Sequence, residues 1–580
     1  MEKRPLPTLL DEIAALLEIK GDNPFKVRAY QNAAKVLSTL SDDLNEIVKQ
    51  KRLKDIKGIG ATISAKIEEY IETGGILYHE ELQKELPLSL LGLLQIPNLG
   101  PRKIKSLYDE LNIRNVGELE YACKENRLIS LFGFGEKTQE KILKGIEFFK
   151  RHQGEYLFGE IYPLALSIKE RFRGEVSAEH VEVCGSLRRK KEIVRDIDLL
   201  VSSSDWRGVS ELFRSMPQVQ EVIAEGPTKT SCRLFAGIEA DLRVVSPESF
   251  PSAFIYFTGS KEHNVKLRGI AKRKGLKLNE YGLFEDEEAL PCADEVSVYG
   301  ALGLSFIPPE LREDMGEIEA AENGRVPDLV RPEDIQGLFH VHSAYSDGRD
   351  SIEEIADAAR QLGLTYVGIS DHSRSAFYAG GLKVDDVLRQ WDEIDRFNAR
   401  GENLHIFKGI ESDILPDGSL DYDEKILEGF DFVIGSIHSS FGMAKEDMER
   451  RIEQAMMNPF ITMFGHPTGR LLLARDGYQV DMIKVIDQSA QNNVIIELNA
   501  SMYRLDVDWR YLKYAREKGV MCSINPDAHA TKDLSDLFYG VGIARKGWQE
   551  RKDVLNTRNV EEVKAIFERI KNVKRHAVCS

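Results

Sequence analysis

The clearest pattern of hydrophobic and polar positions lies at residues 196–201, where two acids interrupt an apolar, β-prone run. Side chains alternate along a strand, so Asp196 and Asp198 are predicted to point to the same face. Two carboxylates on one face repel each other unless cations lie between them, and Mg²⁺ is the usual cation for hard oxygen ligands. Acids in such a strand would be costly without a metal, which argues against an ordinary charged surface loop. The pattern therefore predicts a strand that binds metal ions.

A turn with groups that bind phosphate precedes this strand. Gly185 and Ser186 supply free backbone N–H groups and a hydroxyl, and Arg188 and Arg189 supply two guanidinium groups. These are the groups needed to hold a triphosphate. Asp241, in another β-prone segment, is the candidate for the third carboxylate of a two-metal site for in-line phosphoryl displacement.

The N-terminal part of the chain is helical in pattern. Three stretches, at 56–67, 94–103 and 131–138, place glycines between one predicted helix and the next. Backbone N–H groups at a helix N-terminus suit a phosphate. One such turn is more often an ordinary interhelical loop, but three, each followed by a helix with Lys or Arg, indicate helix-hairpin-helix DNA binding. The second copy departs from the pattern, because Pro97 and Asn98 stand where a first glycine is usual.

In the C-terminal part, short apolar strands alternate with helical segments, and many strands end in a histidine or an acid. A single strand-end histidine is more often a hydrogen-bonded core residue. Six at successive strand ends, joined by three acids, predict a convergent ring at the C-terminal mouth of a barrel. Imidazole and carboxylate ligands together suit Zn, Mn or Fe. The predicted ligands are His340, His342, Asp347, His372, Glu411, His438, His466, Asp527 and His529.

Glu411 is expected to bridge two of the ions, because a carboxylate can bridge two cations and an imidazole cannot. The expected distribution is His340, His342 and Asp527 on one ion, His438 and His466 on a second, and Asp347, His372 and His529 on a third.

Length and composition set further limits. A chain of 580 residues is too long for one core, and its 42% hydrophobic and 30% charged residues are ordinary for a globular protein. There is no apolar run of membrane-span length and no signal peptide, and the six cysteines lack a C-x-x-C pairing, so we expect reduced thiols in the cytoplasm. The net charge of −17 argues against nucleic acid, but most of the excess acid lies beyond Met315.

Residues 184–201 resemble the G-S-x-R-R…D-x-D pattern of nucleotidyltransferases, which drug-modifying and tRNA-tailing enzymes share. The stretches 254–264 and 278–283 narrow the resemblance to the family X DNA polymerases, the group that includes animal polymerase beta, over about residues 1 to 315. This resemblance implies that Asp196, Asp198 and Asp241 bind two Mg²⁺ ions and that Asp241 helps to activate the primer 3′-OH. It also implies that Tyr256, Phe257 and Gly259 line the sugar and disfavour a ribose 2′-OH.

The resemblance implies two further sets of contacts. The residues implied to bind the incoming nucleotide are Gly185, Ser186, Arg189, Tyr256, Phe257, Gly259 and Asn264. The residues expected to contact DNA, with the hairpin glycines included, are Lys26, Gly58, Gly60, Gly100, Gly133, Gly135, Arg268 and Glu280.

Lys66 matches the family's Schiff-base lysine for removal of 5′-deoxyribose phosphate, and Lys26 matches a nearby phosphate contact. The alternative for Lys66 is an ordinary exposed helix lysine, because Thr62 stands where animal members carry another lysine. Glu239 likewise replaces an arginine beside the third aspartate.

The C-terminal pattern resembles the PHP (polymerase and histidinol phosphatase) family, a distorted (β/α)₇ barrel with a trinuclear site, over about residues 335 to 570. The two halves together resemble bacterial or archaeal family X polymerases with a C-terminal PHP domain. The expected fold is multidomain α/β, with a helical helix-hairpin-helix N-terminal region, a nucleotidyltransferase palm with a mixed sheet, and the PHP barrel. The expected parts are an N-terminal helical, lyase-like domain (1–85), a helix-hairpin-helix subdomain (86–150), the palm (151–247), a nucleotide- and template-binding subdomain (248–315), a linker (316–334) and the PHP domain (335–580).

The expected function is a monomeric DNA-directed DNA polymerase that fills short gaps in base excision repair. The PHP domain is expected to be a 3′-5′ exonuclease, with 3′-phosphatase and AP endonuclease as further options. Its cofactors would be two Mg²⁺ in the palm and up to three Mn²⁺ or Zn²⁺ in the barrel, and its partners gapped or primer–template DNA and dNTPs, without a membrane. Two alternatives stay open: a PHP phosphatase of a small metabolite that the polymerase half only targets, and a non-catalytic DNA-binding scaffold.

Overall fold

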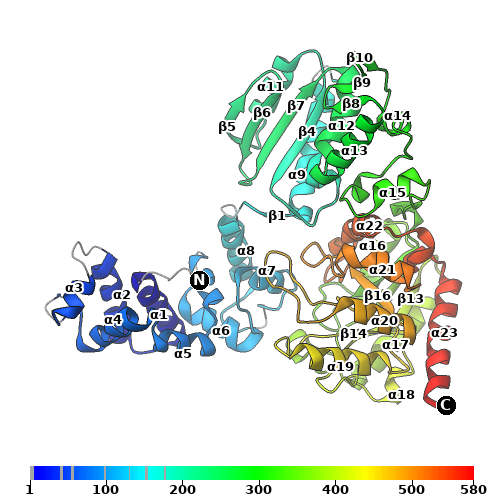
Figure 1. Ribbon diagram of the computed structural model, residues 1–580. Helices are drawn as coiled ribbons and strands as arrows, with labels where there is room; N and C mark the ends of the chain where they lie inside the picture. Colours follow the sequence, from blue (N-terminus) through cyan, green and yellow to red (C-terminus); the bar gives the residue numbers. More distant parts are fainter. Residues whose placement is uncertain are drawn as a thin grey trace. The chain divides into compact units, whose positions relative to one another are not determined.

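The computed structural model describes residues 6–38, 44–53, 56, 58–96, 99–129, 131–150, 154–175 and 178–579. It separates into two compact units, Met1–Lys150 and Arg151–Ser580 (Figure 1). Among the described residues, no helix has the length and apolar character that crossing a membrane requires.

The N-terminal unit is helical, as the sequence predicts. Its core is aliphatic and joins Leu10 and Leu17 of the first helix to Ile63 and Ile67 of α4 in one buried cluster. Helices α4 and α6 begin after Gly60 and Gly100, whose extended backbones leave the first N–H groups without a side-chain cap. The described elements are α1 (Leu6–Lys20), α2 (Pro24–Ser38), α3 (Leu44–Lys49), α4 (Ala61–Thr73), α5 (Leu77–Glu85), η2 (Leu88–Gln95), α6 (Pro101–Leu111), α7 (Val116–Lys124) and α8 (Glu136–Lys150).

The second unit begins with a mixed sheet, which confirms the predicted palm. Within residues 178–579, five strands lie in the order β2 (His180–Val183), β4 (Asp196–Ser202), β7 (Glu239–Val245), β6 (Lys229–Leu234) and β5 (Val219–Glu225). Strands β4 and β7 run parallel and the other neighbours run antiparallel. The short strands β1 (Tyr156–Leu157) and β3 (Ile193–Val194) pair separately.

The alternation predicted for β4 is present. Ile197, Leu199 and Val201 belong to the buried cluster that contains the rings of α9 (Phe158–Glu175) and α11 (Trp206–Ser215). Leu200 belongs to a different cluster, with residues of α12 (Phe250–Thr258). Strand β4 therefore has apolar contacts on both faces, while Asp196 at its start remains exposed and Asp198 is half-buried.

The subdomain after the palm places helices beside a small antiparallel sheet. Its elements are α12, α13 (Lys261–Arg273), β8 (Leu276–Asn279), β9 (Gly282–Glu285), β10 (Glu288–Leu290) and α14 (Glu295–Ala301). The segment expected as a linker contains α15 (Glu317–Glu322) and a short turn at Pro332–Asp334. Helix α15 packs on this subdomain, where Glu317 is bonded to the buried ring of His263 at 2.8 Å.

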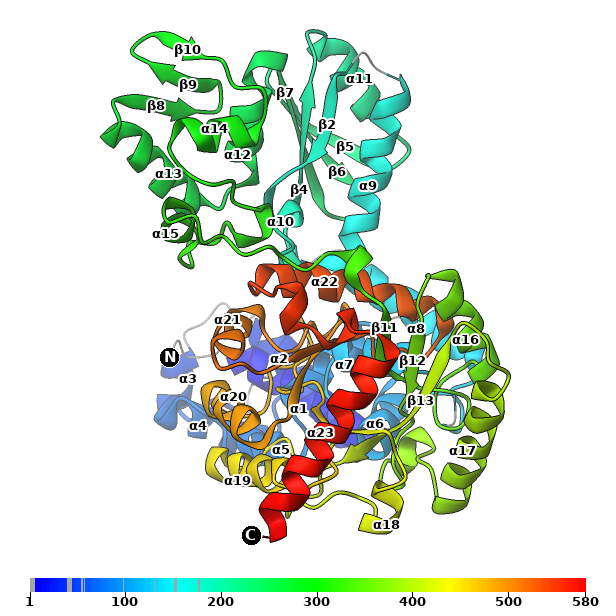
Figure 2. The same ribbon diagram turned by 90° about the vertical axis from the view of Figure 1, so that its right-hand side faces the viewer.

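The remainder of the chain is a parallel barrel, which confirms the predicted PHP fold (Figure 2). Over residues 335–579 the strands follow chain order: β11 (Gly337–Val341), β12 (Tyr366–Ile369), β13 (His405–Asp413), β14 (Phe432–Ser436), β15 (Met463–Phe464), β16 (Ile495–Asn499) and β17 (Cys522–Asn525). A bridge between Val341 and Ala528 brings the two edges together and nearly closes the barrel. The helices are α16 (Ile352–Gln361), α17 (Val384–Asn398), α18 (Glu424–Leu427), α19 (Lys445–Met456), α20 (Met482–Asn492), α21 (Trp509–Glu517), α22 (Leu537–Lys546) and α23 (Val560–Cys579).

Apolar side chains fill the end of the barrel at which the strands begin. Phe339, Tyr366, Phe407 and Phe432 form a buried cluster with Phe567 of α23. This end of the barrel is therefore a packed core, and polar chemistry is left to the opposite end, where the strands finish.

Candidate functional site

The three acids of the palm converge at one end of the parallel strand pair. In the register of β4 and β7, Asp198 lies directly opposite Asp241, and Asp196 lies opposite Glu239. Ser231 Oγ donates to Asp241 Oδ1 at 2.6 Å, and Lys229 Nζ lies 2.6 Å from Asp241 Oδ2. The structure thus brings together the three predicted carboxylates.

The electrostatics of these acids fit a cation site. Burial raises the pKa of Asp198 to about 7, and the charges of Asp196 and Asp241 add to the shift. Burial, followed by the charge of Asp241, also raises the pKa of Asp196. Hydrated divalent cations would relieve this repulsion, and hard oxygen ligands suit Mg²⁺.

Gly185 allows the phosphate turn to approach these acids. Its backbone is left-handed, with φ of 58°, and a methyl group here would lie 2.0 Å from Asp198 Oδ2. In the next residue, the Ser186 Oγ is buried and has no hydrogen-bond partner among the described residues. A buried hydroxyl without a partner, in a turn that closely approaches the Asp198 carboxylate, favours a bound ligand.

The two arginines of the turn have different partners. Arg188 makes two hydrogen bonds with Glu295 of α14, and its guanidinium lies 3.4 Å from the centre of the Phe254 ring. Arg189 donates from Nε to Glu313 at 3.0 Å and from Nη1 to the Thr258 carbonyl. Both arginines therefore tie the turn to the following subdomain.

The predicted sugar and base residues lie on α12 and α13. Tyr256 and Phe257 make an edge-to-face ring contact at 5.2 Å. Asn264 Nδ2 donates to the Tyr256 carbonyl at 2.7 Å, and Arg268 Nε donates to the Asn264 carbonyl at 3.3 Å. A small hollow is lined by Tyr256, Asn264 and Arg268 together with Asn279 of β8. Glu280 follows Asn279 in the turn between β8 and β9 and is not among the residues that line this hollow.

In the N-terminal unit, the two predicted lysines share one tyrosine. Lys26 Nζ donates to the Tyr78 hydroxyl at 2.6 Å, and Lys66 Nζ lies 5.9 Å from the centre of the Tyr78 ring. Lys66 also forms an ion pair with Glu69 at 2.8 Å. This ion pair would have to open before Lys66 could act as a nucleophile.

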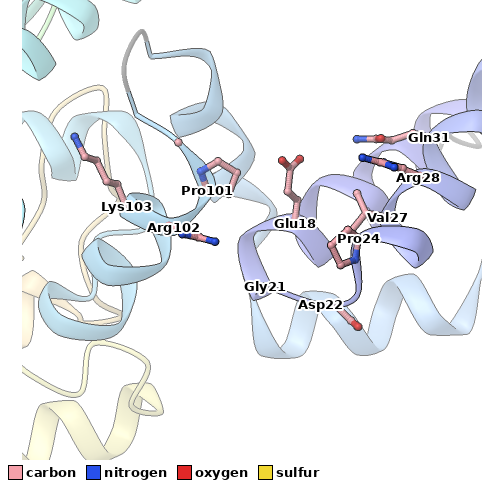
Figure 3. Close-up of a pocket in the computed structure, with 11 residues that line it drawn as sticks. Glu18, Gly21, Asp22, Pro24, Val27, Arg28, Gln31, Pro101, Arg102 and Lys103 are labelled. Atoms are coloured by element: carbon pink, nitrogen blue, oxygen red, sulfur yellow. The ribbon is translucent and has the colours of Figure 1, made fainter.

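Figure 3 shows a hollow in the same unit, between the turn that joins α1 to α2 and the start of α6. It has a volume of about 680 Å³ and includes the predicted Gly100. Arg28, Arg102 and Lys103 line it together with acidic side chains. Pro97 and Asn98, the irregular part of this hairpin, lie outside the described residues. The other hairpin glycines, Gly58, Gly60, Gly133 and Gly135, precede α4 and α8.

The structure brings all the predicted barrel ligands together where the strands end. Their donor atoms form four overlapping groups, each suited to hold a metal ion: His342, Asp347, His372 and His529; His340, His466 and Asp527; His340, His342 and Glu411; His372, Glu411 and His438. His466 therefore lies with His340 and Asp527, whereas the sequence suggested His438 as its companion.

Glu411 lies between two of these groups. One carboxylate oxygen lies 3.3 Å from His340 Nε2 and 3.2 Å from His438 Nε2, and the other lies 2.9 Å from His372 Nδ1. This position suits a carboxylate that bridges two ions.

Hydrogen bonding fits metal ligands, whereas protonation differs among them. Burial alone would lower the pKa of His340, His372 and His438, but the neighbouring carboxylates raise it, so a cation that binds these rings would displace a proton. Burial lowers the pKa of His342 to about 3, helped by the neighbouring His529 and His372. Burial alone would raise the pKa of Glu411, but His438, His340 and His372 hold it well below its usual value. Both ring nitrogens of His342 and of His372 are buried without a well-formed hydrogen bond among the described residues. Neutral imidazoles and ionised carboxylates are the forms that bind metals.

Two further acids orient the ligands and were not predicted. Glu497 of β16 is bonded to His340 Nδ1 at 2.6 Å and accepts from the His466 backbone N–H, and Asp413 of β13 is bonded to His438 Nδ1. Glu497 could have been noticed as an acid within the apolar segment 494–498, whereas Asp413 stands in a strand that already contains Lys408 and Glu411. Such partners fix the tautomer and the ring orientation of a metal-binding histidine.

Three of the ligands have left-handed backbones. The φ angles are 58° at His340, 25° at His466 and 53° at Asp527. This conformation is uncommon outside glycine and clusters at functional sites, where the surrounding structure maintains it.

Comparisons with known proteins identify the parts of the chain. Four parts of the chain match described families: a helix-hairpin-helix domain over residues 1–76, a SAM-like helix-hairpin-helix tandem over 90–147, the DNA polymerase beta thumb over 253–313 and the PHP domain over 339–501. The DNA polymerase/3′-5′ exonuclease PolX of Bacillus subtilis (strain 168) is 39% identical to this chain, over 98% of this chain and 100% of its own length. The chain belongs to the PolX family.

Other relatives match only part of this PolX chain. A probable phosphatase of Thermoanaerobacter sp. (strain X514) is 28% identical over 41% of the chain and 94% of its own length. The crystal structure of Leishmania infantum polymerase beta in a ternary complex aligns with 39% of this chain and 98% of that chain, with 24% identity and a TM-score of 0.26. At that TM-score the likeness carries no further argument.

The first prediction concerns Asp198. Its pKa of about 7 in the folded protein lies above the ordinary 3.8, so the ionised form is disfavoured by folding. The penalty is absent below the ordinary pKa, grows as the pH rises and is complete above about pH 7. In chelator at about pH 8, Asp198→Asn should raise the melting temperature by roughly 2–4 °C for each kcal/mol of repulsion removed. At about pH 4 the difference should vanish. An equal or lower melting temperature for the variant at the higher pH would contradict the raised pKa of Asp198.

The second prediction concerns the bridging role of Glu411. Glu411→Ala should reduce the metal content of the barrel by about two ions, whereas His438→Ala, which belongs to one group, should reduce it by about one. Elemental analysis of the purified variants measures this difference. His405→Ala is the matched control, because His405 lies at the opposite end of β13 from Glu411 and belongs to none of the groups. Equal losses for Glu411→Ala and His438→Ala would exclude the bridge.

Proposed function

We propose that this chain is a DNA-directed DNA polymerase that fills short gaps in DNA and that its barrel is a metal-dependent 3′-5′ exonuclease. The observation that carries the proposal is the convergence of Asp196, Asp198 and Asp241 on one parallel strand pair, in a chain that also holds the complete ring of barrel ligands. The Bacillus subtilis relative, named for both activities, supports it over nearly the whole chain.

In the palm, the residues of this chain would bind and orient the reactants. Arg189 and the Ser186 hydroxyl would hold the phosphates of an incoming dNTP, and Tyr256 and Phe257 would lie against its sugar. Asp241 would take part in activating the primer 3′-OH, with Ser231 and Lys229 holding its carboxylate in place. Divalent cations bound at either site would neutralise the charge that develops at phosphorus and lower the pKa of the attacking hydroxyl or water.

In the barrel, the ligand ring would hold up to three ions, and the proposed reaction is hydrolysis of a phosphoester at a DNA 3′ end. Glu497 and Asp413 would keep His340 and His438 in the orientation that binds a cation. We assign two Mg²⁺ to the palm, because its ligands are all oxygens, and Mn²⁺ or Zn²⁺ to the barrel, because its ligands are mostly imidazoles.

The N-terminal unit would hold gapped or primer–template DNA, through helix starts whose N–H groups lack side-chain caps. We propose a role in base excision repair, as a monomer in the cytoplasm. The free thiols of Cys123, Cys184, Cys232, Cys292 and Cys522 are compatible with a reducing compartment.

A phosphatase activity is the second candidate for the barrel. It is favoured by the likeness of this region to the Thermoanaerobacter probable phosphatase. Primers that end in a 3′-phosphate and a small phosphate ester, supplied in parallel assays, distinguish DNA-end cleaning from the metabolite alternative. The intact palm carboxylates speak against a non-catalytic scaffold.

The third prediction separates the two activities on one substrate, a gapped duplex with a labelled primer, incubated with Mg²⁺ or Mn²⁺ and with or without dNTPs. Asp198→Asn should lower primer extension by at least about 10²-fold and leave 3′ degradation unchanged, because the two sites use separate ligands. Glu411→Ala should lower 3′ degradation and leave primer extension unchanged. Normal extension by Asp198→Asn would refute the palm assignment, and normal degradation by Glu411→Ala would refute the exonuclease assignment.

The fourth prediction concerns the lyase assigned to Lys66. Borohydride should trap the protein on DNA with a 5′-deoxyribose phosphate end, and Lys66→Ala should remove the adduct, because the Schiff base needs the Lys66 amine. Lys105→Ala is the matched control, since Lys105 also forms an ion pair within a helix of this unit. An adduct that persists in Lys66→Ala would assign the chemistry to another lysine.

A further inference from the structure

A helix of the barrel contacts the phosphate turn of the palm. Figures 1 and 2 both show α22 on the side of the barrel that meets the polymerase part of the same unit. Its last residue, Lys546, is fully buried. Lys546 Nζ donates to the Arg189 carbonyl oxygen at 3.0 Å and to Glu313 Oε1 at 2.6 Å.

Glu313 is shared between this lysine and the arginine proposed to bind the nucleotide. Arg189 Nε donates to the same oxygen, Glu313 Oε1, at 3.0 Å. The Glu313 side chain is only 8% exposed, so water contributes little to balancing its charge. The Lys191 ammonium is more distant, with its Nζ 3.9 Å from Glu313 Oε2. Lys546 and Arg189 therefore share one oxygen of Glu313, and each weakens the interaction of the other with that carboxylate.

A second contact fixes the neighbouring residue of the turn. The Lys190 ammonium lies 3.9 Å from the ring centre of Tyr162 in the palm and 4.8 Å from that of Phe538 in α22. The backbone of Lys190 is left-handed, with φ of 55°. Helix α22 thus holds two successive residues of the turn, one through a carbonyl and one through a cation–π contact.

The Arg189 side chain has little room to find another position. Its Nη1 donates to the Thr258 carbonyl, and a methyl group on Gly259 would lie 2.9 Å from that nitrogen. If Lys546 were absent, more of the charge of Glu313 would act on Arg189, because Lys191 lies farther from the carboxylate. The carboxylate would then compete with a triphosphate for the same guanidinium group.

We propose that Lys546, a residue of the PHP barrel, is a positioning residue for the polymerase site. By taking part of the charge of Glu313 and holding the Arg189 carbonyl, it leaves the Arg189 guanidinium to the triphosphate of the incoming dNTP. The inference rests on the proposed function, in which Arg189 binds that triphosphate. It makes nucleotide binding in the palm depend on a residue of the barrel.

The test is steady-state filling of a one-nucleotide gap by the full chain, with exonuclease activity measured on the same preparations. Lys546→Met keeps much of the side-chain volume and removes the charge. It should raise the KM for dNTP about tenfold and change kcat less than about twofold, the effect of roughly 1.4 kcal/mol of lost binding. The double variant Lys546→Met with Glu313→Gln removes both charges and should return the KM close to the wild-type value.

The matched control is Lys574→Met. Lys574 is also a buried lysine of the barrel, but it donates to the carbonyls of Ile461 and Asn458 and has no palm partner in the described part of the chain. This variant should leave the KM for dNTP unchanged. A purely structural role for Lys546 predicts instead that the double variant is at least as impaired as Lys546→Met.

Arg189→Lys distinguishes this inference from the function on which it rests. If Arg189→Lys raises the KM for dNTP and Lys546→Met does not, the positioning role is refuted and the proposed function stands. If Arg189→Lys leaves the KM unchanged, the phosphate assignment fails and the inference fails with it. Should Lys546→Met not fold, the charge-balanced double variant decides, because a KM raised about tenfold in that protein refutes the charge-sharing argument.

Discussion

Carboxylates held partly or wholly out of water are the constraint on which both halves of this PolX chain depend. Parallel neighbouring strands bring residues of the same register side by side, and the chain places acids at such positions instead of apolar residues. In the palm, Asp198 lies opposite Asp241, and burial together with the neighbouring acids raises the pKa of Asp198 to about 7. In the barrel, the acids lie among imidazoles, and Glu411 remains ionised. Negative charge held out of water is therefore reduced in two ways. In the palm Asp198 is protonated below about pH 7, and in the barrel the histidines partly neutralise the carboxylates.

The contact between the polymerase part and the barrel pairs charges of opposite sign. Arg470 of the barrel pairs with Glu192 of the palm at 3.1 Å, and Arg545 of α22 pairs with Glu310 at 2.8 Å. Removing one partner from a pair of this kind strands the other charge, which is far more destabilising than replacing both.

Much of both sites could be predicted from the sequence because their signal is local. Acids that alternate with apolar residues in 196–201 identify a metal-binding strand, and histidines at successive strand ends identify a ring. The residues that were missed act at a distance along the chain. Glu497 and Asp413 become recognisable as orienting groups only when the barrel closes, and nothing near Arg189 in the sequence indicates Lys546. The family resemblance already indicated Arg189 as the arginine that binds phosphate, and the fold adds that Arg188 is paired with Glu295. Local patterns thus identify ligands, whereas their supports come from tertiary structure.

The left-handed backbones of His340, His466 and Asp527 have a consequence for how such a barrel would change over evolutionary time. A non-glycine residue in this conformation costs of the order of 1–2 kcal/mol, and glycine or asparagine would relieve most of it. If the barrel no longer used its ions, replacing these residues by glycine or asparagine would stabilise the protein. Such replacements would therefore be expected early at these three positions. Histidine and aspartate at all three positions, in spite of this cost, are expected where the side chains themselves are needed.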